Sequence, residues 1–538
     1  MSRYREDWPR MTRREALIAM GAMGSLTALA GCAGSRALGH KTALAQSGAN
    51  GEPLSDQEKR DLAERAIEIC RRLGASYADA RIVCKRSSRI ATEDRRIRHI
   101  VDERSEGMGI RVIAHGAFGF ASTRSLAPAE IEEVAALAVE VAKASATQTL
   151  GAAVSLADEP PHRGRYASPR SIDPFSIGLA RRVELLLAAN AAMLAVPGVG
   201  KAHSHMVFLQ DKKTFASTNG SCLETDILRV EAELTAMATG DGDSQSRSYS
   251  SSPSAAGYEW IEQARLIENA PRVGAEAVEK LRARPSPSGK FDLILLPSHL
   301  YLPIHESVGH ATELDRVLGM EESLSGGSFA TVSSLGKLRY GSPKVSFRVE
   351  NRRGDFLASV GYDDDGVECQ DWDIVRDGVL VGFSTNREVV QAMQGKRSHG
   401  CSRADSWNSI PILRMGNVCL MPGNKRVSLD DLIADTRRGI LIDGDGSFSI
   451  DNKRRNFQFG GDACFEIENG KRAGMLKQVT YQSITPDFWG SCDALCDERE
   501  WRPFGTLHCG KGDPMQTSQI THACVPARFR GVTVRRAE

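Results

Sequence analysis

The sequence lacks a surplus of charge of either sign, because its 69 lysines and arginines nearly balance its 68 aspartates and glutamates and give a formal net charge of +1. Proteins that mainly bind nucleic acid have a basic surplus or a basic face, so we expect no nucleic-acid partner. With 12 cysteines in 538 residues, the chain also lacks the cysteine density of a disulfide-bonded scaffold. It shows no internal repeat of about 20–50 residues, which argues against solenoids and propellers.

Aromatic residues are also scarce, at 6%, but the other proportions are those of a globular protein. Hydrophobic residues make up 41% of the chain and charged residues 25%. This is too much apolar content for a disordered chain and too much charge for a membrane-embedded one. At about 100–200 residues per domain, the length predicts two or three domains, each large enough to bury its own core.

The first fifty residues have the features of a targeting sequence rather than of a domain. A twin-arginine pattern, Thr-Arg-Arg-Glu-Ala-Leu at positions 12–17, leads into an uncharged run over residues 16–31. This run is shorter than the roughly 20 residues that a membrane-spanning helix needs. We therefore expect residues 1–50 to be a leader for export by the twin-arginine route.

Two positions suit cleavage of this leader. Leu-Ala-Gly-Cys at residues 29–32 resembles a lipobox, at which bacterial lipoproteins are cleaved and the cysteine, here Cys32, is acylated. Ala-Leu-Ala at residues 43–45 has the small-x-small form of ordinary signal cleavage. The expected product is a periplasmic protein or a lipoprotein attached to the membrane through Cys32. The alternative is an uncleaved apolar leader on a cytoplasmic protein.

The mature chain is predicted to begin with a mixed α/β domain at residues 51–285. Ser55 and Glu58 form a capping-box pattern, which predicts a helix from there to about residue 72. Glycines after residues 107–114 predict a hairpin. A shift to proline and serine at residues 284–289 marks the domain boundary. Apolar spacing predicts further helices over residues 128–144, 174–194 and 259–282, and strands over residues 80–85, 107–114, 202–208 and 227–238.

Residues 290–538 are predicted to form a mostly antiparallel β domain, so that the fold class of the whole chain is α+β. Short β-like segments separated by Gly and Asp turns replace the helical periodicity there, with hairpin turns at residues 377–378 and 469–470. Two acidic, glycine-containing segments, residues 363–366 and 443–446, resemble calcium loops in composition only. Because both lack the rest of an EF-hand ligand series, we predict that they are turns.

A candidate metal site follows a buried strand predicted at residues 291–297. His305 and His310 bracket Glu306 on a helix-like stretch, and two imidazoles with a carboxylate suit a hydrolytic zinc site. Histidines five residues apart lie about 140° apart around a regular helix, against about 40° for the i, i+4 spacing. Both reach one ion only if the helix bulges or ends, and Gly309 is the expected position. The alternative is a chance pattern on a solvated helix face.

Five motifs in order resemble the TldD/PmbA metallopeptidase family, in its TldD branch, over nearly all of the mature chain. The core motif is residues 291–315, which include both histidines, Glu313 and Asp315. The other motifs are residues 109–112 leading to 119–123, residues 361–367, residues 403–407 followed by Pro411 and residues 414–417, and residues 509–512.

The resemblance implies a zinc metallopeptidase in which His305, His310 and Cys509 bind the metal and Glu306 is the catalytic acid/base; we expect no other cofactor. Three protein ligands and one open position are typical of catalytic zinc. Zinc would acidify a water molecule, Glu306 would accept its proton, and the resulting hydroxide would attack a peptide carbonyl. The C-terminal β domain would therefore carry the metal site.

The resemblance further implies substrates and partners. The substrates would be flexible or unfolded peptides, held largely through their backbones as added strands. The chain would act as a homodimer or as a heterodimer with a TldE/PmbA-like subunit. Export departs from the cytoplasmic relatives of this family, so the biological role is open. The main alternative is an exported, catalytically weak, metal-containing peptide-binding subunit of a TldD/TldE-like complex.

Two further cysteines have competing interpretations. Cys492 and Cys496, with His508 and Cys509, fit a closed structural zinc site, but their spacing is loose and this site would take Cys509 from the catalytic ion. We favour core thiols or, after export, a disulfide.

Other polar residues are interpreted as follows. His203 and His205 would share one face of a strand, as a satisfied or solvated pair rather than a metal site. His508 and His522 either flank the active cleft or, as we favour, are ordinary surface histidines. Glu313 either accepts a hydrogen bond from the imidazole three residues before it or lies solvated on the helix.

Overall fold

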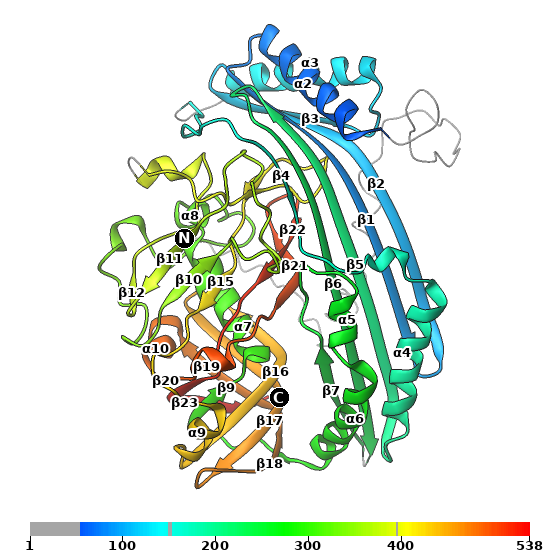
Figure 1. Ribbon diagram of the computed structural model, residues 1–538. Helices are drawn as coiled ribbons and strands as arrows, with labels where there is room; N and C mark the ends of the chain where they lie inside the picture. Colours follow the sequence, from blue (N-terminus) through cyan, green and yellow to red (C-terminus); the bar gives the residue numbers. More distant parts are fainter. Residues whose placement is uncertain (1–53, 149–152, 241, 394–395, 538) are drawn as a thin grey trace, which may run out of the picture. The chain divides into compact units, whose positions relative to one another are not determined.

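The computed structural model describes residues 54–148, 153–240, 242–393 and 396–537 (Figure 1). The predicted leader, with its twin-arginine pattern, its two cleavage positions and Cys32, lies outside these residues. Within the described ranges, no helix has both the length and the apolar character needed to cross a membrane. All described residues belong to one compact unit of the chain.

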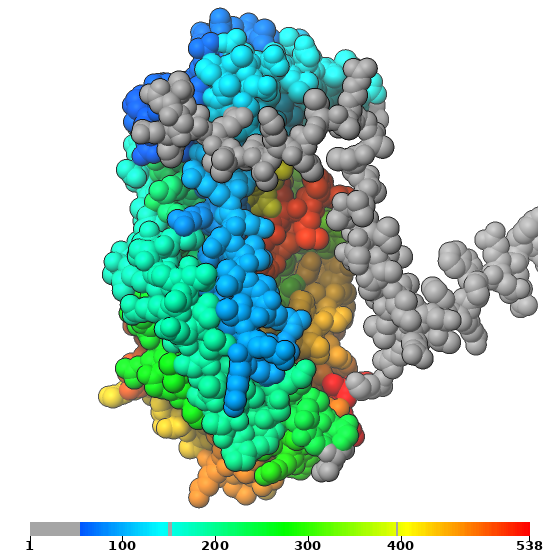
Figure 2. Space-filling view, turned by 90° about the vertical axis from the view of Figure 1, so that its right-hand side faces the viewer, coloured from blue at the N-terminus to red at the C-terminus, as the bar shows by residue number. Residues whose placement is uncertain are grey.

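The first half of the described chain is built on a seven-stranded sheet with four long strands. The long strands pair antiparallel in the order β2-β1-β5-β6, where β1 is Tyr77–Glu93, β2 is Arg96–Ala114, β5 is Val199–Ser217 and β6 is Cys222–Gly240. Shorter strands complete the sheet: β3 (Ala117–Thr123) beside β2, and β4 (Arg163–Ala167) and β7 (Asp243–Ser250) beside β6. Figure 2 shows the face on which β2, in blue, lies largely exposed between residues 96 and 104.

Helices cover one face of this sheet in two groups (Figure 1). α2 (Asp56–Arg72) and α3 (Pro128–Ala146) form one hydrophobic core with β1–β3, and α4 (Leu179–Leu194) and α6 (Leu266–Arg282) form another with β5 and β6. Even-numbered residues of β6 from 228 to 238 lie in the second core. Because side chains alternate along a strand, the odd-numbered residues of β6 point away from these helices. Arg229 is one of them, and it donates a hydrogen bond to the Leu357 carbonyl of the C-terminal half.

Local patterns in this half agree with the predictions, but two of the predicted helices differ from the structure. The capping box at Ser55 is present and α2 follows it, and β2 and β3 form the predicted hairpin. The single helix predicted over residues 259–282 is wrong, because Arg265 has a left-handed backbone (φ 47°) that separates α5 (Glu259–Gln263) from α6. Similarly, the helix predicted from residue 174 begins with a single 3-10 turn, and α4 starts only after Gly178.

The C-terminal half is organised by a mixed sheet around β9 (Gly289–Leu295), the buried strand predicted before the metal motif. β9 pairs parallel with β16 (Arg438–Ile450) and antiparallel with β23 (Ala527–Arg536). β16 also pairs with β17, so that five strands close into a ring in the order β16-β9-β23-β19-β17. β17 is Asn456–Glu468, β18 Lys471–Lys477 and β19 Val479–Ile484, and their pairings with one another and with β23 are antiparallel. The predicted α+β class, with much antiparallel sheet, is confirmed.

Turn chemistry accounts for the hairpins of this half. Both central residues of the Asp377-Gly378 and Asn469-Gly470 turns have positive φ, as the predicted two-residue hairpins require. Residues 363–366 form the predicted turn, since the Gly366 N–H donates to the Asp363 carbonyl at 3.1 Å. Residues 443–446 do not form a turn; they continue strand β16, whose pairing with β17 shifts register between Asp445 and Phe448. The shift lets the strand accommodate the glycines without reversing direction.

A buried ion cluster joins the long sheet to the C-terminal half. Arg111 of β2 contacts Asp79 of β1 and Asp365 of the 363–366 turn, at 2.6 and 2.8 Å. All three side chains are at most 2% exposed. A second link joins Arg247 of β7 to Asp443 and Asp462. The boundary predicted at residues 285–290 falls between the two halves but stays a prediction, because these contacts hold the described residues in one unit.

Candidate metal centre

The metal motif lies on a helix that changes its winding. α7 (Pro297–Ile304) follows β9, continues as a π-helical turn over His305–Gly309, and ends in a 3-10 turn over His310–Thr312. The His310 N–H donates to the His305 carbonyl, which is the i, i+5 hydrogen bond of a π turn. Residues five apart therefore lie on the same side, and the predicted bulge is confirmed. A Cβ at position 309 would lie 2.4 Å from the Met415 sulfur, so any larger residue there would force the buried Met415 side chain to move.

Three donor side chains meet beside this turn. His305 and His310 come from the bulged helix, and Cys509 comes from β21 (Gly505–Lys511), which pairs with β22 (Gln516–Thr521) as a hairpin. Their ligand atoms all lie within 4.8 Å of one another, and each residue is 4% exposed. His310 Nε2 and Cys509 Sγ are 3.5 Å apart. Two such atoms around a tetrahedral zinc ion are about 3.6 Å apart, so the geometry and the chemistry of these donors fit zinc.

A chain of hydrogen bonds assigns the tautomer of His305. The Val418 carbonyl can only accept, so His522 donates to it from Nδ1 at 2.8 Å. Burial and the neighbouring His305 hold the pKa of His522 well below its ordinary value, so its Nε2 is an acceptor. His305 therefore donates from Nδ1 to His522 Nε2 at 2.8 Å. The lone pair on His305 Nε2 is left free for a metal ion.

His310 is oriented by a carboxylate. Glu313 Oε2 accepts from His310 Nδ1 at 2.8 Å, and Glu313 is fully buried. Burial would raise the pKa of Glu313, but Lys511 and His310 hold it well below its ordinary value. Lys511 Nζ lies 3.2 Å from Glu313 Oε1 and also pairs with Asp315. The interpretation of Glu313 as the hydrogen-bond partner of the His310 imidazole is confirmed, and its interpretation as a solvated carboxylate is wrong.

Cys509 and Glu306 each have an arginine partner. Arg414 donates from Nη2 to the Cys509 sulfur at 3.0 Å. Burial would raise the pKa of the Cys509 thiol, but His310 and Arg414 lower it below its ordinary value, so the thiolate form is favoured. Glu306, which is 7% exposed, forms an ion pair with Arg454 from the segment between β16 and β17. The motif thus places a buried carboxylate, already oriented by a guanidinium, beside two histidines.

The comparison with protein families agrees with these residues. Three family models match in chain order: PmbA/TldA metallopeptidase domain 1 at residues 78–142, the central domain at residues 172–284, and the C-terminal domain at residues 288–534. The chain belongs to the PmbA/TldD metallopeptidase family. The resemblance predicted from the ordered motifs is therefore confirmed, and the C-terminal family domain contains all three donor residues.

Relatives in this family carry metalloprotease names. A metalloprotease from Methanothermobacter thermautotrophicus is 30% identical over 435 residues, which cover 81% of this chain and 90% of the relative. A zinc metalloprotease TldD homolog from Saccharolobus solfataricus is 23% identical over 391 residues, or 70% and 79% of the two chains. The crystal structure of TldE from Thermococcus kodakarensis has a TM-score of 0.68 at 16% identity and covers 89% of this chain and 100% of that one. The structural similarity shows a shared fold.

The other cysteines and histidines considered as candidates either lie outside this centre or have a different burial from the one predicted. Cys492 and Cys496 are free, buried thiols in the core of the C-terminal half, and Cys509 belongs with the histidines instead. His203 and His205 join no group of three metal-ligating side chains among the described residues. His508 is exposed as predicted. The prediction of a surface histidine at His522 is wrong, because this residue, directly after β22, is completely buried and hydrogen-bonded to His305.

Several site residues were missed by the sequence interpretation. Arg414 and Lys511 lie inside two of the motifs that carried the family resemblance, so position gave a signal but no role. Arg454 and His522 lie outside every motif, and contacts between segments far apart in the sequence bring them to Glu306 and His305. Metal binding by the three donors, and the role of Glu306, stay predictions.

The hydrogen-bond chain through His522 predicts a graded response to substitution. We expect His522→Leu to weaken zinc binding by about 10–100-fold, the usual loss when an outer partner of a metal-bound histidine is removed. In His522→Gln, the amide oxygen can accept from His305 while the amide nitrogen donates to Val418, so zinc affinity should stay within a few-fold of wild type. Titration against a competing chelator measures both. Equal losses in the two variants would show that His522 contributes packing only.

Proposed function

We propose that this member of the PmbA/TldD family is a zinc-dependent metallopeptidase with Glu306 as its general base. The observation that carries the proposal is the convergence of the ligand atoms of His305, His310 and Cys509 within 4.8 Å, beside the bulged helix that carries both histidines and Glu306. Two imidazoles and a thiolate are ligands that zinc favours, and three of them leave one tetrahedral position open. Metalloprotease names among the relatives support the same reaction class.

Different side chains have different roles in the proposed hydrolysis. When bound, zinc supplies a Lewis acid that polarises a carbonyl oxygen and acidifies a water molecule. His305 and His310 hold the ion through nitrogens whose orientation is fixed by His522 and Glu313. Glu306 accepts a proton at its carboxylate and then delivers it to the leaving amine, while Arg454 keeps that carboxylate in place.

Flexible or unfolded peptides are the proposed substrates, and their cleavage tests the function. We expect an unstructured peptide to be cleaved by the purified protein, the cleavage to stop when a chelator removes the metal, and one equivalent of zinc to restore it. Mass spectrometry identifies the products, and metal analysis confirms each state. Cleavage that continues in protein shown to be free of metal would overturn the proposal.

A complex of the TldD/TldE type is proposed as the assembly, supported by the shared fold with TldE; a homodimer is the alternative. Light scattering of the chain alone and mixed with a TldE-like subunit from the same genome tests this. A mass unchanged by the second subunit would contradict the heterodimer.

Export, with acylation of Cys32, is a further proposal that rests on the leader sequence. Cell fractionation beside a Cys32→Ala variant tests it, and equal membrane association of both would contradict acylation.

A further inference from the structure

The guanidinium of Arg414 is buried and makes few contacts, which are all specific. Arg414 follows the short strand β14 (Ile412–Leu413) and is 1% exposed. Its Nη1 donates to the Gln516 carbonyl at 2.9 Å, and its Nη2 donates to both the carbonyl and the sulfur of Cys509. The side chain is therefore tied to both strands of the β21–β22 hairpin, next to the proposed metal ligand.

No carboxylate neutralises Arg414. Other arginines of similar burial pair with acids: Arg111 with Asp79 and Asp365, and Arg247 with Asp443 and Asp462. Arg414 makes no ion pair with any described carboxylate, although burying an unpaired charge is costly. The one group in contact with its guanidinium that carries a negative charge when ionised is the Cys509 sulfur.

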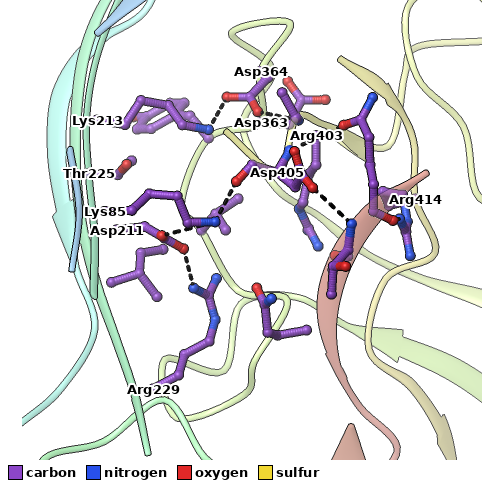
Figure 3. A pocket seen from close by; sticks show the side chains of 18 residues that line it. Lys85, Asp211, Lys213, Thr225, Arg229, Asp363, Asp364, Arg403, Asp405 and Arg414 are labelled. Carbon is purple, nitrogen blue, oxygen red and sulfur yellow. Dashed lines mark hydrogen bonds and ion pairs between the residues drawn. The ribbon is translucent and has the colours of Figure 1, made fainter. Parts of the chain in front are cut away.

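Arg414 makes no ion pair with the other described carboxylates of its surroundings, which are bound to other groups: Asp405 accepts from Ser409 Oγ and the Thr517 N–H, and Asp363 accepts from backbone N–H groups. Figure 3 shows Arg414 on one wall of a pocket of about 50 Å³, across from charged residues of the long sheet. Those residues are paired among themselves and with the 363–366 turn: Lys213 with Asp364, and Arg229 with Asp211. The sheet side of the pocket therefore offers no free carboxylate to Arg414.

We infer that Arg414 is the counter-ion of the Cys509 thiolate and a positioning residue that tunes the metal centre; this rests on the proposed zinc site. A thiolate donates more charge to a metal ion than an imidazole does, which makes the ion a weaker Lewis acid. The N–H···S hydrogen bond draws electron density back from the sulfur, as hydrogen bonds around a ligating cysteine do at other metal sites. The same contact fixes the direction in which the sulfur points. Arg414 thereby lets a thiolate-containing site keep enough electrophilicity for hydrolysis.

Cobalt substitution tests the inference through the sulfur itself. Co²⁺ bound at the three donors gives a sulfur-to-cobalt charge-transfer absorption, whose energy falls when the sulfur loses a hydrogen bond. In Arg414→Met we expect one Co²⁺ per chain with this band moved to longer wavelength, and peptide cleavage about 10–100-fold slower. Arg403→Met is the matched control: Arg403 lines the same pocket but donates to the Ala358 carbonyl and not to Cys509. Its band should stay at the wild-type wavelength.

Each outcome decides between the inference and its premise. A band at the wild-type wavelength in Arg414→Met overturns the role of Arg414 while leaving the metal site intact. A wild-type protein with bound Co²⁺ but no such band overturns the metal site itself. If Arg414→Met does not fold, resonance Raman spectra of the wild-type cobalt form in H₂O and D₂O decide. An isotope shift of the cobalt–sulfur stretch supports an N–H···S bond, and no shift overturns it.

Discussion

Replacing Glu306 by glutamine is expected to lower kcat for peptide cleavage by about 10²–10⁴-fold, the range that a positioned general base contributes. Glutamine has the same shape but cannot accept the proton. Glu306 is not one of the three converging donors, so metal content should remain at one ion per chain. The amide oxygen can still accept from Arg454, which preserves the contact that orients residue 306. Steady-state kinetics with metal analysis of the same preparation measures both quantities.

The control for this prediction is Glu268→Gln, because Glu268 is exposed and lies on α6, which carries none of the donors. It should leave both cleavage and metal content unchanged. Unchanged cleavage in Glu306→Gln would refute the assigned role of Glu306. A wild-type chain that binds metal and peptide but cleaves no faster than Glu306→Gln would favour the alternative function, a catalytically weak peptide-binding subunit.

Replacing Cys509 by alanine is expected to abolish both metal binding and cleavage. The thiolate is one of only three protein donors, and its loss leaves two imidazoles on one helix turn, too few to hold zinc against solvent. Zinc affinity should therefore fall by more than the about 10–100-fold that loss of an outer partner costs. Metal analysis after dialysis, followed by titration against a chelator, measures this loss.

Cys492→Ala provides the matched control, since Cys492 is an equally buried free thiol in the core of the same half. Its removal leaves a similar small cavity, so a general effect of packing would appear in both variants. We expect Cys492→Ala to keep one zinc ion per chain and most of its activity. Retention of zinc by Cys509→Ala, or its loss from Cys492→Ala, would contradict the assignment of the ligands.

Much of the local structure could be predicted because short-range physics determines it. The capping box at Ser55 and the hairpin turns at 377–378 and 469–470 depend on neighbouring residues only. The π turn followed from a single geometric requirement, namely that His305 and His310 face one ion across five residues. Cys509 entered through the family motif, because no spacing links a thiol to histidines about two hundred positions earlier.

The residues that escaped prediction depend on contacts between distant segments. His522 is buried against His305, 217 residues earlier in the chain, and Arg454 reaches Glu306 only once β16 and β17 have paired. The break at Arg265 reflects a backbone conformation that apolar periodicity does not encode. The acidic glycine segment at 443–446 has the composition of a turn, but pairing with β17 keeps it in a strand. Tertiary structure overrides local preference in each case.

The most direct test of a zinc centre built from these donors is X-ray absorption at the zinc edge of the purified protein. We predict one sulfur at about 2.3 Å and two imidazole nitrogens at about 2.0–2.1 Å, with a further light-atom ligand at the open position. A shell without sulfur, or one closed by several sulfurs as a site with Cys492 and Cys496 would give, would contradict the account.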